Sequence, residues 1–107
     1  MREPISITAI ASISPLGNTD DSVWKNYLEN KPLFREKSFG AERALVATLD
    51  ETANGLLDTL RQSDSKYKSL DRSVLMAISA SRDAVAKAGW HHGDFGVNIG
   101  SSRGATE

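Results

Sequence analysis

The sequence predicts an α/β fold, because a long helical pattern lies between two segments that alternate like β-strands. The helix is predicted over residues 70–88, where apolar side chains recur at steps of three, four and seven without an intervening Pro or Gly. The strands are predicted over residues 5–13 and 95–100, in which apolar residues alternate with mostly small ones. Such strands with helices packed on them form an α/β layer.

The first predicted strand, ISITAIASI, has small residues on one face, which suits a closely packed helix. It ends at the turn 14–17, since Pro15 cannot donate to a ladder and Gly17 permits a tight turn. A short helix then begins at Asn18 or Thr19 and stops before Pro32. The predicted remainder is a loop over 31–43, a short edge strand over 45–49, a helix over 52–61 and a polar connector over 63–69.

The long helix has clear signals at both ends. Ser69 and Asp71 are candidate N-caps, and Gly89 suits the left-handed position after the last turn, with Trp90 placed for the accompanying contact. The helix is also rich in Ala and Ser, so we expect other elements to cover it on more than one side. Two predicted strands do not complete a sheet, and we therefore expect the chain to be a piece of a larger fold.

Composition excludes several classes of function. The chain has 107 residues, 39% hydrophobic and 25% charged, which allows one domain with a modest core and argues against disorder. A net charge of −1 gives no electrostatic basis for binding nucleic acid or an anionic membrane. Cysteine is absent, so the chain has no thiolate nucleophile and no cysteine-ligated metal. Neither a signal peptide nor a membrane-spanning run is present, and we expect a cytoplasmic protein without membrane insertion.

Most candidate chemistry has a simpler structural explanation. His91 and His92 lack a third ligand at metal spacing, so we predict a solvated turn and no metal. Neighbouring acidic residues at 20–21 and 50–51 fit the starts of helices. The turn over 100–104, with Arg103, can cradle an anion but lacks the lysine of a phosphate-binding loop.

Basic residues gather before the long helix, at Lys66, Lys68 and Arg72. Positive charge at a helix N-terminus opposes the helix dipole, so helix stability does not explain the cluster. Either it is a solvated face, or it is a docking patch for an acidic partner.

Three segments together resemble the N-terminal part of the β-ketoacyl synthases, the condensing enzymes of fatty-acid and polyketide assembly. They are ISITAIASISPLGNTDDSVWKNYLENK, SLDRSVLMAISASRDAVAKAGW and FGVNIGSSRG. The resemblance implies that residues 1–107 are an N-terminal fragment of a β-ketoacyl synthase domain, the incomplete N-terminal portion of a thiolase-like layered α/β fold. It also implies an acyltransferase parent that catalyses decarboxylative Claisen condensation of acyl and malonyl thioesters on acyl carrier protein. The family's nucleophilic Cys and assisting His come from later segments, so the chain alone is expected to be inactive, and no cofactor is expected.

Individual positions carry over from that resemblance. Lys68, with Lys66 as a substitute, matches a basic position that docks the acidic carrier protein. Arg103 matches a position, commonly apolar, that lines the far end of the acyl pocket near the dimer interface. The parent is expected to be a homodimer or to pair with a synthase-like partner.

Two alternatives stay open. One is a non-catalytic subunit of the same fold, of the chain-length-factor type. The other is a small free-standing α/β module that binds an anion at residues 100–104.

Overall fold

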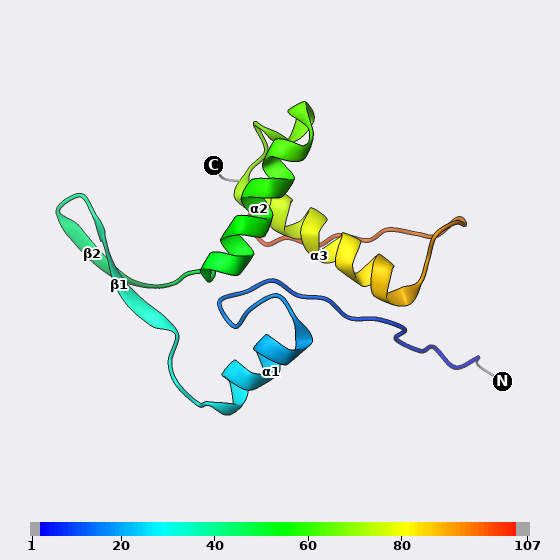
Figure 1. Cartoon of the computed structure of the whole chain (residues 1–107), viewed down its shortest axis with the longest axis horizontal. Coiled ribbons are helices and arrows are strands. Elements are labelled where there is room, and N and C mark those ends of the chain that lie inside the picture. The colour runs from blue at the N-terminus through cyan, green and yellow to red at the C-terminus, as the bar shows by residue number, and fades with distance from the viewer. Residues whose placement is uncertain (1–2, 105–107) are drawn as a thin grey trace.

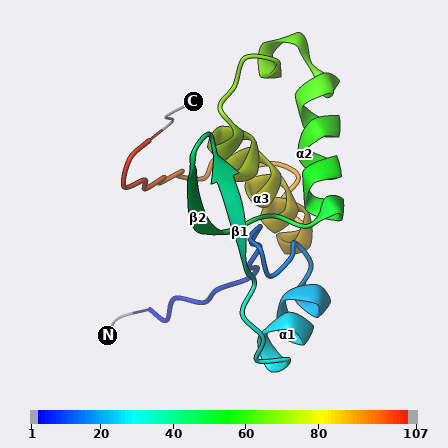
Figure 2. The ribbon, with the colours of Figure 1, turned by 90° about the vertical axis from the view of Figure 1, so that its left-hand side faces the viewer.

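A computed structural model describes residues 3–104, which form helices, one short turn of 3-10 helix and one antiparallel hairpin (Figure 1). The hairpin projects from the helices, and the N-terminal segment passes between α1 and α3 (Figures 1 and 2). In chain order the elements are α1 (Asp20–Leu28), β1 (Phe34–Phe39), β2 (Glu42–Ala47), α2 (Glu51–Ser63), the 3-10 turn η1 (Ser65–Tyr67) and α3 (Arg72–Ala88). The described chain is thus mixed α and β, as predicted at this coarse level.

Helix α3 begins and ends where the sequence indicates. Asp71 is the N-cap, and its carboxylate accepts the Ser73 N–H at 2.7 Å. Gly89 has a left-handed φ of 71°, and its N–H donates to the Ala86 carbonyl. The Trp90 N–H donates to the Val85 carbonyl at 3.2 Å, which completes a Schellman motif.

The two shorter helices are also capped locally. Thr19 and Ser22 form a reciprocal capping box at the start of α1, with hydrogen bonds of 3.1 and 3.2 Å. Asp50 caps α2 by accepting the Ala53 N–H at 2.8 Å. Gly17 precedes α1 with a φ of 123°, and a Cβ there would collide with the Ser22 side chain. The predicted turn and both helix starts are therefore confirmed.

The hairpin corrects two predictions. Residues 31–43 are not a loop throughout, because β1 occupies 34–39 and pairs with β2, with Phe34 opposite Ala47 and Phe39 opposite Glu42. The strand predicted over 45–49 is instead β2, which begins and ends earlier and has β1 as its partner. The sequence FREKSF of β1 does not alternate between apolar and polar residues, because all six residues are exposed. A strand without a buried face lacks the pattern by which strands are predicted.

The strands predicted over residues 5–13 and 95–100 do not form in the described chain. Both segments run without a ladder, and the single isolated bridge joins Ser14 to Gly17. A strand requires a hydrogen-bonded neighbour, and the described residues place none beside either segment. Most of their large apolar side chains remain in solvent, with Ile5 98% and Ile99 75% exposed.

The core lies where α2 and α3 cross and is small. Among the described residues, the buried hydrophobic side chains are Ala53, Leu57 and Leu75. The expectation that α3 is covered on more than one side is met only in part, since α2 and the N-terminal segment lie against it but Leu75 is its one buried residue. The radius of gyration is 16.6 Å, whereas a closely packed domain of this length has about 13 Å. No described helix has both the length and the apolar character that a membrane crossing requires.

Candidate functional site

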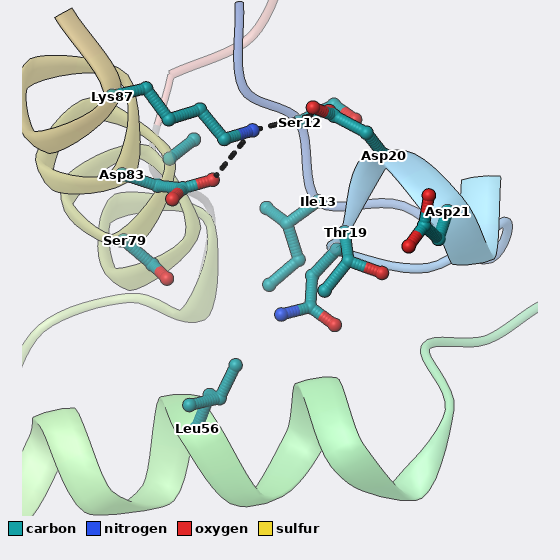
Figure 3. A pocket seen from close by; sticks show the side chains of 11 residues that line it. Ser12, Ile13, Thr19, Asp20, Asp21, Leu56, Ser79, Asp83 and Lys87 are labelled. Atoms are coloured by element: carbon teal, nitrogen blue, oxygen red, sulfur yellow. Dashed lines mark hydrogen bonds and ion pairs between the residues drawn. The ribbon is translucent and has the colours of Figure 1, made fainter. Parts of the chain in front are cut away.

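An open pocket of mixed polar and apolar lining lies between the turn before α1 and the helices α2 and α3 (Figure 3). Its volume is about 500 Å³, and its polar groups are the carboxylates of Asp20, Asp21 and Asp83, the Lys87 ammonium and the Ser79 hydroxyl. Leu56 from α2 and Ile13 from the N-terminal segment supply apolar surface. This pocket brings together three separate parts of the chain.

Lys87 binds the groups around the edge of this pocket to one another. Its Nζ lies 3.1 Å from Asp20 Oδ1 and 3.3 Å from Asp83 Oδ2, and it donates to the Ile10 carbonyl at 3.1 Å. The hydrogen bond to Asp20 is the largest influence that raises the pKa of Lys87 above its ordinary 10.5. Lys87 is thus a protonated ammonium at neutral pH whose three donors face three acceptors. It cannot act as a general base and instead joins segments of the fold.

The second candidate site is the basic turn formed by η1 and the residue after it. Asp64 caps the turn, since its carboxylate accepts the Lys66 N–H at 2.9 Å. The Lys68 N–H donates to the Ser65 carbonyl at 3.4 Å. Lys66 and Lys68 are both exposed, so the structure brings these two predicted docking residues together on one short turn.

A contact that sequence reasoning missed joins this turn to α3. Arg82 Nη2 donates to the Tyr67 hydroxyl at 2.9 Å, and the guanidinium carbon lies 5.7 Å from the centre of the Tyr67 ring. The combination of a hydrogen bond and a cation–π contact fixes both the direction and the distance of the pair. No local sequence pattern predicts the contact between Tyr67 and Arg82, because the two residues are 15 positions apart in different elements.

The remaining predicted residues lie apart from these two sites. Arg103 is exposed in the C-terminal segment, with no hydrogen bond or ion pair to any described residue. In the same turn, the Gly104 N–H donates to the Ser101 hydroxyl at 2.8 Å. His91 and His92 are exposed, and the described residues contain no cluster of three metal-ligating side chains.

The acidic pairs take the places expected for helix starts. Asp20 lies in the first turn of α1, and Asp50 is the N-cap of α2. Asp20 has the additional role of accepting a hydrogen bond from Lys87, which its position in the sequence does not reveal.

Comparison with known proteins identifies one family. The model of the family described as beta-ketoacyl synthase, N-terminal domain, matches residues 2–107. Neither a curated protein nor a solved structure matches the chain.

Proposed function

Because the chain belongs to the beta-ketoacyl synthase N-terminal domain family, we propose that it is the first part of a condensing enzyme with a thiolase-like layered α/β fold. The observation that carries this proposal is the family match over residues 2–107. The uncovered apolar segments support it, because strands over 5–13 and 95–100 would need neighbours that the described residues do not supply.

The proposed reaction is decarboxylative condensation of an acyl and a malonyl thioester carried on acyl carrier protein. Such an acyl transfer needs a nucleophile with a lowered pKa, an oxyanion hole and proton donors for the enolate. This chain has no cysteine, so the nucleophile must come from outside these 107 residues. Its own contribution would be a layer of the fold and a surface for the carrier protein.

The docking surface is the basic turn. Lys66 and Lys68 are exposed and form no ion pair with any described residue, so their charges are accessible to an acidic partner. Exposed cations of this kind act mainly by steering association and by contributing charge pairs at the rim of an interface.

An activity assay tests the enzymatic part of the proposal. We expect the 107-residue chain to show no malonyl decarboxylation and no condensation, whereas the full-length protein shows both. Turnover by the 107 residues alone would contradict the assignment, because it would require a nucleophile that the proposal places elsewhere. A full-length protein that retains the fold but shows neither reaction would favour the non-catalytic subunit instead.

Arg103 is proposed to restrict the acyl pocket of the full-length protein. An unpaired guanidinium is costly to bury, so it must either find an acceptor or shorten an otherwise apolar channel. We expect efficient use of short acyl-carrier substrates and poor use of long saturated ones. The Arg103→Leu variant should accept longer chains, and equal use of long chains by the unmodified protein would contradict this role.

A further inference from the structure

The surface around the basic turn carries more positive charge than the two lysines supply. Arg82 of α3 is exposed and contacts Tyr67 between Lys66 and Lys68. The ion pairs among described residues join Arg43 to Glu36 and Lys87 to two aspartates, and none involves Lys66, Lys68 or Arg82. This end of the molecule therefore presents three cations that form no ion pair with a described carboxylate.

The acidic residues of this region are bound to backbone groups. The Asp64 carboxylate accepts the Lys66 N–H at 2.9 Å as the cap of η1. The Asp71 carboxylate accepts the N–H and the hydroxyl of Ser73 at 2.7 and 2.6 Å as the cap of α3. Both carboxylates therefore act as caps of helical turns.

The side-chain contact of Tyr67 holds the turn against the middle of α3. The hydrogen bonds that build η1 are local, such as the Tyr67 N–H to the Asp64 carbonyl at 3.0 Å. They define the shape of the turn, and the Leu70 N–H, which donates to the Tyr67 carbonyl at 3.2 Å, ties it to the residues just before α3. The Tyr67 hydroxyl accepts from Arg82 Nη2 at 2.9 Å, and this bond links the turn to α3. Tyr67 is half-buried, so its ring has a defined place.

We propose that Arg82 is a third docking residue for an acidic carrier protein and that Tyr67 is a positioning residue that orients the lysine turn. This inference rests on the proposed docking function of Lys66 and Lys68. Arg82 uses one nitrogen for Tyr67, and a guanidinium has further N–H groups that can bind a carboxylate of the partner. The partner surface must carry several carboxylates, because single exposed cations gain affinity only when several carboxylates meet them together.

The two roles predict different effects of salt. We expect Arg82→Ala to weaken binding of the 107-residue chain to a purified acyl carrier protein by about fivefold and to lower the salt dependence of binding. Tyr67→Phe keeps every charge, so it should weaken binding by about twofold without changing the salt dependence. Arg82→Lys keeps the positive charge but loses the planar guanidinium group, so its affinity should lie between those of Arg82→Ala and the unmodified chain.

The control is Arg43→Ala on the hairpin, which removes the same charge from an exposed site elsewhere. The inference is overturned if Arg43→Ala weakens binding as much as Arg82→Ala, or if neither Arg82→Ala nor Tyr67→Phe has an effect. The double variant Lys66→Ala, Lys68→Ala tests the proposed function separately. If this double variant binds the carrier protein as tightly as the unmodified chain, the docking role of Lys66 and Lys68 is refuted. If the double variant loses binding but Arg82→Ala binds normally, only the role proposed for Arg82 is refuted.

Discussion

Lys87 links three parts of the chain that are distant in sequence. It contacts Asp83 one helical turn earlier, Asp20 at the start of α1, and the carbonyl of Ile10. The Asp20 hydrogen bond raises the pKa of Lys87 most, and the Asp83 hydrogen bond raises it less. We therefore expect Asp20→Asn to lower the titration midpoint of the Lys87 ammonium more than Asp83→Asn does. NMR of the side-chain Cε–H group across alkaline pH measures both, and the opposite order would contradict this geometry.

The same contact predicts how stability depends on pH. The pKa of Lys87 is raised in the folded chain, so the proton is held more tightly there than in the unfolded chain. The stabilisation is complete below pH 10.5 and is lost as the pH rises through the raised value. The free energy of unfolding, measured by circular dichroism in urea, should fall over this range in the unmodified chain. It should fall less in Lys87→Arg, whose guanidinium stays charged.

At the scale of elements, two glycines in comparable surroundings should respond oppositely to alanine. Gly89 ends α3 at a φ of 71°, whereas Gly55 lies inside α2, and nothing lies within 4 Å of a Cβ added to either. Gly89→Ala should cost about 1–2 kcal/mol, because only the backbone conformation is strained. Gly55→Ala should stabilise α2 by about 1 kcal/mol through helix propensity. Far-UV circular dichroism in urea measures both, and equal signs would contradict the assigned backbone angles.

The hairpin makes a separate prediction about association. In antiparallel pairing of two copies of β1, opposite residues must differ by an even number of positions. The two registers that overlap most of the strand place Lys37 against the same residue of the second copy, or Glu36 against its own counterpart. Like charges directly opposite each other disfavour both registers.

Removing one of these charges should favour pairing of β1 with β1 of a second copy. We expect Lys37→Val to increase self-association in sedimentation experiments, because the register centred on residue 37 then has no like-charge pair. Lys25→Val on α1 is the matched control, since it removes one exposed charge outside the hairpin. Equal association of the two variants would mean that net charge, and not the strand edge, keeps the copies apart.

The sequence predicted those features that depend on neighbouring residues. The caps at Thr19 and Asp71 and the Schellman turn at Gly89 each involve groups a few positions apart. The Asp83–Lys87 pair was not predicted, although it has the spacing of a helical ion pair. The contacts of Lys87 with Asp20 and Ile10 span 67 and 77 positions, and no short pattern encodes them. The hairpin escaped prediction because its pairing satisfies the backbone without burying a side chain.

At the scale of the whole molecule, much apolar surface has no cover. The described chain extends 58 × 39 × 25 Å around a core of three buried side chains. Ile7 and Val97 are 79% and 75% exposed although both belong to segments with a strand pattern. Burial of one such side chain contributes about 1.5–3 kcal/mol, so the uncovered segments represent a large unrealised stabilisation.

Because these apolar side chains are exposed in the 107-residue chain, replacing one with a polar residue should destabilise the full-length protein more than this chain. Ile7→Asn should leave the helix content of the 107-residue chain unchanged, because the side chain contacts mainly solvent there. In the full-length protein the same change should cost about 2–5 kcal/mol if residues 5–13 become an interior strand. Leu75→Asn is the reference, since Leu75 is fully buried and should be destabilising in both forms. Urea unfolding of the four variant proteins measures the difference. An equally small effect of Ile7→Asn in both forms would mean that this segment stays in solvent, and the strand assigned to it by family membership would then be wrong.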